Sequence, residues 1–177
     1  MTSFGPLVRA FGAVFVAAML QIVIVSSLVI AGGAPDVLLV VVVALGLLRG
    51  SIVGAGLGFF GGLLVDVVTL GTLGISSLVL TLAGFWSGRY AETTGRGRAL
   101  APLAAVGVIT VVAGVFGFVL HYMLGEDVDA RHSLLTALLP ALVLNLLLAL
   151  PVHRFLRAIV GEGEGVEAAS DVEVAVS

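Results

Sequence analysis

Long apolar runs alternate with short polar breaks along the chain, and this pattern predicts membrane-spanning helices. A helix needs about 20 apolar residues to cross the hydrocarbon core of a bilayer. The runs predict six spans, at residues 8–30, 35–48, 51–70, 75–90, 100–124 and 133–156. The second run is short, so we expect it to use its flanking residues or to thin the bilayer locally.

Short connectors join these runs, so the sequence predicts one six-span transmembrane domain over residues 1–160. The fold class that follows is an all-α integral membrane protein, a bundle of six transmembrane helices. Residues 161–177 contain five acids and no base. A segment of this composition buries too little apolar surface to fold, which predicts a disordered acidic cytoplasmic tail.

The composition supports a membrane protein and excludes several other classes. Hydrophobic residues make up 60% of the chain and charged residues 11%, too few to cover the apolar runs in water. The formal net charge of −3 argues against a nucleic-acid partner. The chain has no cysteine, so disulfides, thiolate metal sites and thiol nucleophiles are excluded.

The positions of the arginines predict the orientation of the spans. With the N-terminus inside, seven of the eight arginines fall on the cytoplasmic side: Arg9, Arg49, Arg89, Arg96, Arg98, Arg154 and Arg157. Only Arg131 falls outside. This distribution obeys the positive-inside rule. We therefore expect a multi-pass membrane protein with both termini in the cytoplasm and with Asp36 and Asp66 toward the outer face.

A row of glycines marks the third span. Residues four apart form one slowly winding stripe on a helix, here Gly50, Gly54, Gly58, Gly62 and Asp66. Small residues at this spacing let two membrane helices approach closely, which predicts a contact surface for another helix. Two interpretations remain open. The second helix belongs either to the same chain, where Gly84 and Gly88 form a shorter complementary pair, or to a partner protein.

Three charged residues near the predicted helix ends are further candidates. A carboxylate at bilayer depth is expensive and normally contacts protein or water. Asp36 follows Pro35 and opens the second span, so it either caps that helix or makes an interhelical or partner contact. The same two roles remain open for Asp66. Arg49 closes the second span, either as an interfacial anchor or as a contact for a partner or a lipid phosphate.

The sequence shows no pattern typical of catalysis or of a bound cofactor. It lacks the GxGD context of intramembrane aspartyl proteases, a phosphate-binding loop and a cluster of metal ligands, so we expect no enzyme and no cofactor. Gln21 and Asn145 lie within spans, where interhelical hydrogen bonds are their expected role. A bundle of this kind could still hold a ligand near its outer mouth.

Three segments resemble one protein family. The stretches "APDVLLVVVVALGLLRG", "GFFGGLLVDVVTLGTLGISSL" and "GFWSGRY", within residues 34–90, resemble MreD, the rod-shape-determining membrane protein of bacteria. The resemblance implies a subunit of the cell-elongation machinery, the elongasome. It implies MreC as a partner, with RodA, its penicillin-binding transpeptidase partner and the MreB filament in the same assembly. It also implies a fold similar to the S-components of energy-coupling-factor transporters.

The resemblance also implies which positions matter. The family-like residues are Pro35, Asp36, Arg49, Gly50, Gly58, Gly62, Asp66, Gly71 and Gly74. Their implied role is helix packing or partner docking. The main hypothesis is a non-enzymatic membrane scaffold that binds MreC and helps organise lateral peptidoglycan synthesis and rod shape. The alternative is a vitamin-type substrate-binding subunit of a transporter, with a pocket beneath the loops that follow the first, third and fifth spans.

Overall fold

The computed structural model describes residues 4–27, 35–70, 72–94, 101–124 and 138–161. These residues form helices and contain no strand, which confirms the all-α prediction. The helices are α1 (Phe4–Ser27), α2 (Val37–Arg49), α3 (Ser51–Thr69), α4 (Ile75–Thr94), α5 (Ala101–Met123) and α7 (Leu138–Val160). Beyond Gly161, the predicted acidic tail lies outside the described residues.

Each of the six predicted spans corresponds to one described helix, but the helices differ in their ability to cross a membrane. Four are long and apolar enough by length and composition, namely α1, α3, α5 and α7. The 13-residue α2 is shorter, and α4 is not among the four. A complete set of six membrane crossings therefore stays a prediction.

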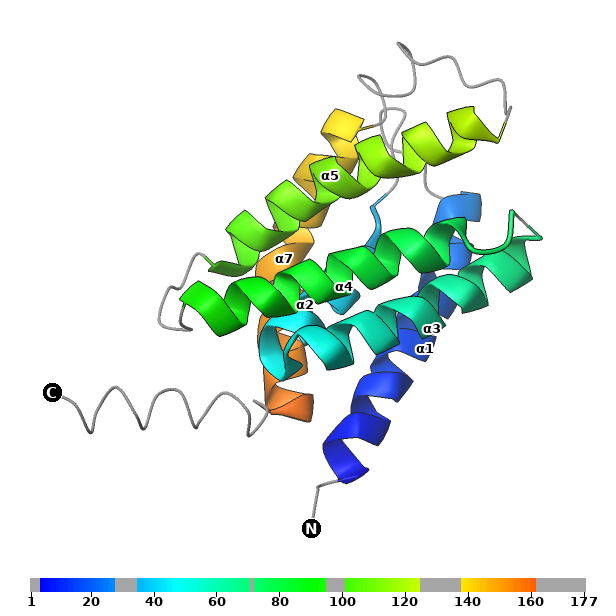
Figure 1. Ribbon diagram of the computed structural model, residues 1–177. Helices are drawn as coiled ribbons and strands as arrows, with labels where there is room; N and C mark the ends of the chain where they lie inside the picture. The colour runs from blue at the N-terminus through cyan, green and yellow to red at the C-terminus, as the bar shows by residue number, and fades with distance from the viewer. Residues whose placement is uncertain (1–3, 28–34, 71, 95–100, 125–137, 162–177) are drawn as a thin grey trace, which may run out of the picture.

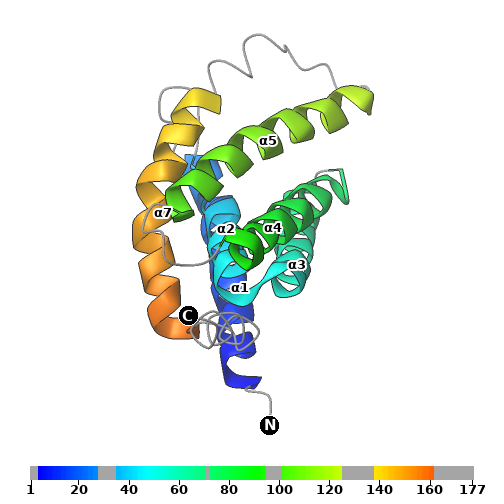
Figure 2. The same cartoon turned by 60° about the vertical axis from the view of Figure 1, so that its left-hand side comes forward.

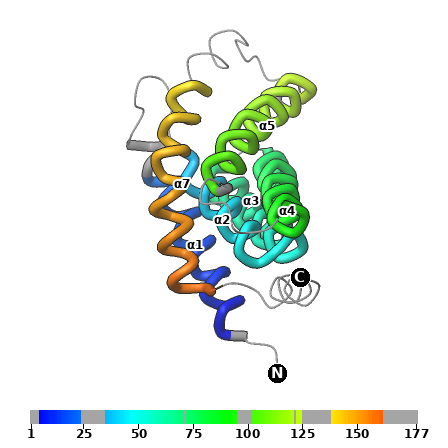
Figure 3. The backbone as a smooth tube through the Cα atoms, turned by 90° about the vertical axis from the view of Figure 1, so that its left-hand side faces the viewer, coloured from blue at the N-terminus to red at the C-terminus, as the bar shows by residue number. Residues whose placement is uncertain are grey.

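Helix α2 forms the centre of the bundle (Figures 2 and 3). Every residue from Leu38 to Leu48 is buried, and each of the other five described helices packs against it. A helix that is apolar on all sides belongs inside a protein or a bilayer, and here protein surrounds it. Whether α2 uses its flanking residues or thins the bilayer locally stays a prediction.

Helices α3 and α4 run side by side and make the closest pair among the described helices (Figure 1). The chain turns between them through Leu70, which has a left-handed backbone with φ of 53°, and Gly74, with φ of 100°. Helix α5 lies across α4 and also contacts α7 and α2. The packing core is thus a central α2 flanked by a tight α3–α4 pair.

The starts of α1, α3 and α5 and the ends of α4 and α7 lie toward one end of the bundle, along the left and the bottom of Figure 1. Two contacts join helices at this end. The Arg9 Nη1 group of α1 donates to the carbonyl oxygen of Ile159 in α7 over 3.2 Å, and the Ser51 N–H of α3 donates to the Glu92 carboxylate of α4. The described arginines lie near this end of their helices: Arg9, Arg49, Arg89, Arg154 and Arg157. We call it the arginine end. Which side of the membrane it faces stays a prediction.

Candidate functional site

The glycine row of α3 lies directly against the backbone of α4. A Cβ atom built at Gly58 would overlap the carbonyl oxygen of Leu80, and one at Gly62 would overlap the backbone of Ser77. Because the obstructing atoms belong to backbone, no side chain can move aside to make room. The glycines therefore bring the two helices into backbone contact, and a partner's helix would have to displace α4 to reach them.

The close contact is reciprocal and extends to α2. A Cβ atom at Gly84 would overlap the backbone of Gly54, and one at Gly88 would overlap the backbone around Ser51. On α2, a Cβ at Gly46 would lie 2.7 Å from the Gly84 carbonyl oxygen. Sequence reasoning identified the α4 pair but missed Gly46, because a single glycine in a leucine- and valine-rich run shows no repeat.

Gly50 joins α2 to α3 with φ of 93°, a conformation that residues with a Cβ rarely adopt. The next residue, Ser51, donates its backbone N–H to Glu92 Oε1 over 2.8 Å and its hydroxyl to the same oxygen over 2.9 Å. The last turn of α4 therefore caps the start of α3. The Ser51 N–H is also the main reason why the pKa of the Glu92 carboxyl lies below its ordinary value.

Asp66 performs the equivalent task at the other end of the same helix pair. Its carboxylate accepts the backbone N–H of Gly74 over 2.8 Å, and those of Ser76 and Ser77 over 3.3 and 3.4 Å. The side chain is only 3% exposed. Two roles were left open for Asp66, helix capping and an interhelical contact. The geometry shows both, because the Asp66 side chain of α3 caps the start of α4.

The start of α2 is capped by three separate parts of the chain. The Asp36 side chain accepts the N–H of Leu39 over 2.9 Å. The Asp36 N–H donates to Asn145 Oδ1 of α7, and the Val37 N–H donates to Gln21 Oε1 of α1, each over 2.8 Å. Asp36 is thus the N-cap of α2, and side chains from two neighbouring helices hold the remaining donors.

Asn145 also connects α7 to α5. Its side-chain amide donates to Thr110 Oγ1 over 3.2 Å, and the residue is fully buried. The predicted interhelical hydrogen bonds of Gln21 and Asn145 are therefore confirmed. What sequence reasoning missed is their acceptor role at the first turn of α2, because neither residue is near that turn in the sequence.

The remaining family-like positions have smaller roles in the described geometry. Pro35 directly precedes the N-cap of α2, and Arg49 is the last, half-buried residue of that helix. Gly74 has positive φ and lies in open space, and its N–H reaches Asp66. Gly71 lies outside the described residues.

A cavity of about 540 Å³ opens at the end of the bundle opposite the arginine end, between α1, the start of α2, α3, α4 and α5. Its polar lining comes from Gln21, Asp36, Thr69 and Ser76. This is the region where the small-molecule alternative expects a pocket. Within the described parts of the chain, no three His, Asp or Glu side chains gather in a way that could hold a metal ion.

The geometry as a whole joins helices through backbone contact and fixes their ends with hydrogen bonds that are at least partly buried. Comparison with known proteins adds one match: the family model described as rod shape-determining protein MreD covers residues 1–159. No curated protein and no solved structure matches the chain. The similarity to transporter S-components therefore stays a prediction.

Proposed function

Since the chain belongs to the MreD family of rod shape-determining proteins, we propose that it is a non-enzymatic scaffold that binds MreC within the elongasome. In this role it helps organise lateral peptidoglycan synthesis in the bacterial plasma membrane, with both termini in the cytoplasm. RodA, its penicillin-binding transpeptidase partner and MreB belong to the same assembly as direct or indirect partners. The family match carries this proposal, and it does not favour the small-molecule alternative.

The internal use of the polar groups supports a scaffold. The described carboxylates of Asp36, Asp66 and Glu92 all accept backbone N–H groups at helix starts. A frame held in this way keeps its helices in register while its outer faces remain apolar. A partner's membrane helix then meets a preformed surface and requires little reordering of the scaffold, which favours binding.

Two glycines outside the α3–α4 contact mark the surface that we propose for the MreC helix. Nothing lies within 4 Å of a Cβ built at Gly12 of α1 or at Gly56 of α3. Beside them, the exposed rings of Phe11 and Phe60 meet edge to face, with centroids 5.2 Å apart. The glycines leave a depression in the surface, and the neighbouring aromatic rings project beside it. A surface of this shape suits the close packing of a membrane helix.

The test replaces these open glycines by a bulky residue. A Cβ atom at Gly12 or Gly56 has open space around it, so we expect Gly12→Leu and Gly56→Leu to fold, which circular dichroism of each variant checks. We expect at least one of them to reduce co-purification with MreC by about tenfold, which corresponds to ~1.4 kcal/mol. Ala158→Leu, which adds three carbon atoms at an exposed position of α7, is the control for added bulk on another face of the bundle.

Two outcomes contradict parts of the proposal. If both glycine variants retain MreC at the wild-type yield, docking at the open glycines is wrong. If the wild-type protein itself recovers no MreC under mild solubilisation, and its loss leaves rod shape unchanged, the scaffold function is wrong.

A further inference from the structure

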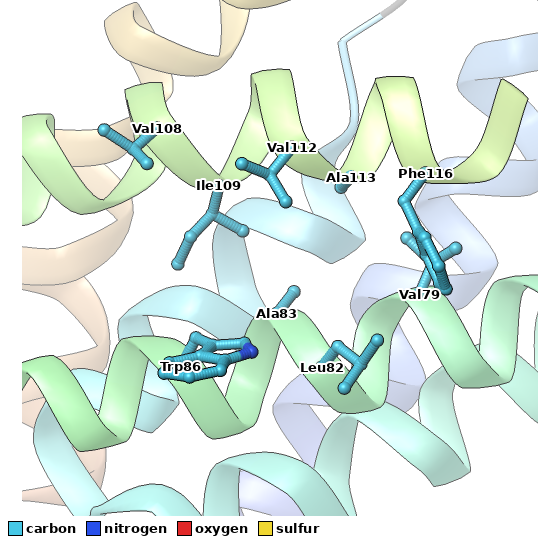
Figure 4. A pocket seen from close by; sticks show the side chains of 9 residues that line it. All are labelled: Val79, Leu82, Ala83, Trp86, Val108, Ile109, Val112, Ala113 and Phe116. Carbon is cyan, nitrogen blue, oxygen red and sulfur yellow. The ribbon is translucent and has the colours of Figure 1, made fainter. Parts of the chain in front are cut away.

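A groove of about 380 Å³ runs between α4 and α5 (Figure 4). Side chains of α4 from Val79 to Trp86 form one wall, and side chains of α5 from Val108 to Phe116 form the other. The lining is apolar apart from the indole nitrogen of Trp86, which Figure 4 shows in blue. The MreC docking surface proposed above lies on α1 and α3, so this groove is separate from it.

The groove leads toward a cation at the arginine end. Leu82, Trp86 and Arg89 are spaced four and three residues apart, so they lie on one face of α4. Trp86 is 60% exposed, and no described residue accepts a hydrogen bond from its indole N–H. Arg89 lies about 4.5 Å further along the helix axis at 1.5 Å per residue.

The ion pair with Glu92 uses only part of the hydrogen-bonding capacity of Arg89. Its side chain is 59% exposed, and Nη1 lies 3.4 Å from Glu92 Oε2. Glu92 accepts two shorter hydrogen bonds from Ser51, through the backbone N–H and the hydroxyl. A guanidinium group has five N–H donors, so most of those on Arg89 remain available to another acceptor.

An apolar groove, an indole donor and a guanidinium group in this order match the parts of a glycerophospholipid. An acyl chain fits the groove, an ester carbonyl oxygen accepts from the indole, and a phosphate accepts from arginine in a bidentate manner. Tryptophan is enriched at the depth of the ester groups for the same reason. A partner's helix, about 10 Å across, would lie over a groove of this size and not within it.

We propose that this groove binds one phospholipid with an anionic headgroup, in the leaflet at the arginine end. One acyl chain lies between α4 and α5, and the phosphate contacts Arg89. The bound lipid fills the space between two helices that touch each other less closely than α3 and α4 do.

Trp86 is the only tryptophan of the chain, so its fluorescence reports on this groove alone. The full-length protein is reconstituted into vesicles of constant composition, one part phosphatidylglycerol to four parts phosphatidylcholine. Bromine atoms, which quench indole fluorescence on contact, are placed on the acyl chains of the phosphatidylglycerol or of an equal amount of the phosphatidylcholine. We expect brominated phosphatidylglycerol to associate with Trp86 about fivefold more strongly than brominated phosphatidylcholine does. A preference of this size corresponds to the attraction between one arginine near the membrane surface and an anionic lipid.

Three variants locate the effect. Arg89→Gln should abolish the preference for phosphatidylglycerol, whereas Arg154→Gln, which removes the same charge from α7, should keep it. Ala113→Leu places extra atoms in the groove and should reduce quenching by both lipids. Circular dichroism of each variant establishes that the helices remain folded.

The proposal is overturned if the two brominated lipids quench Trp86 equally, or if Arg154→Gln abolishes the preference as fully as Arg89→Gln does. It is also overturned if co-reconstituted MreC removes the quenching in the wild type while Gly12→Leu and Gly56→Leu prevent this removal. In that case the groove would belong to the MreC contact.

Discussion

At the scale of single residues, four polar side chains within the helices accept backbone N–H groups at the starts of other helices. The first N–H groups of a helix have no partner inside the helix, and the bilayer core contains no water to replace one. In this chain Gln21 and Asn145 accept N–H groups at the start of α2. Glu92 accepts one at the start of α3, and Asp66 accepts those at the start of α4. A polar residue in such a segment is therefore explained first by the donors that surround it.

Removal of the Asp66 carboxylate should destabilise the protein. Asp66→Ala leaves the N–H groups of Gly74, Ser76 and Ser77 without their acceptor, and we expect a loss of about 2 kcal/mol in the free energy of unfolding. Titration of the purified protein with a denaturing detergent, followed by circular dichroism, measures this loss. Asp66→Asn keeps one acceptor oxygen and should lose less. Equal effects of the two variants would argue against a capping role.

Glu92 should make the stability depend on pH in the acid range. Its folded-state pKa is lower than its ordinary value of 4.5, mainly because of the Ser51 N–H. Its contribution is therefore present above pH 4.5 and is lost as the pH falls through the lower pKa of the folded state. Glu92→Gln should be less stable than the wild type at pH 7, and the gap should narrow below pH 4.5.

The detergent titration described for Asp66, repeated at each pH, measures the effect of Glu92. Arg89→Gln, which leaves the Ser51 contacts in place, should keep most of the pH dependence. If Glu92→Gln has the same free energy of unfolding as the wild type at every pH, the Glu92 cap contributes nothing to stability.

At the scale of helices, the α3–α4 contact depends on the absence of side chains on both sides. Glycine normally weakens a helix, but here it permits an approach that even alanine would prevent. The same helix α3 also carries Gly56, which faces open space. The chain thus offers a packed and an open glycine two residues apart.

This pair gives a direct test of the contact. Gly58→Ala places a methyl group onto the Leu80 carbonyl oxygen and should force α3 and α4 apart, at a cost of about 1–3 kcal/mol. Gly56→Ala meets nothing and should leave the stability unchanged or raise it by about 0.5–1 kcal/mol. Thermal unfolding of the two variants in the same detergent makes the comparison. A Gly58→Ala protein as stable as Gly56→Ala would contradict the backbone contact.

At the scale of the whole molecule, a helix buried on every side organises the others. Helix α2 is too short for a typical span, and α4 is less apolar than the four clear candidates, yet both belong to the bundle. Neighbouring helices cover α2, and the α3 backbone covers one face of α4. The short length of α2 and the lower hydropathy of α4 therefore underestimate how closely these two helices are packed within the protein.

The crossing of α4 can be tested because the chain has no cysteine. Leu73→Cys places a single thiol at an exposed position just before the start of α4, and Thr94→Cys places one at its exposed last residue. We expect a membrane-impermeant maleimide to label Leu73→Cys in intact spheroplasts and Thr94→Cys only after lysis. Labelling of both from the same side would contradict the crossing, and the reverse pattern would invert the proposed orientation.

The sequence alone determined the helical class, the approximate bounds of the six helices and the existence of a close helix contact along Gly54, Gly58 and Gly62. These follow from composition and from residue spacing, which are local properties of a chain. Its arginine positions also indicated that one end of the bundle is basic. The resemblance around Pro35 to Tyr90 pointed to the family that the match over residues 1–159 then established.

Only the tertiary structure decided which helix fills the glycine row, which helix lies at the centre and which acceptor serves each helix start. Asp36 meets Asn145 across 109 residues, and Ser51 meets Glu92 across 41. Nothing in the spacing of these residues identifies the partners. Such contacts arise when all helices pack together, because each buried donor takes the acceptor that the finished arrangement places beside it.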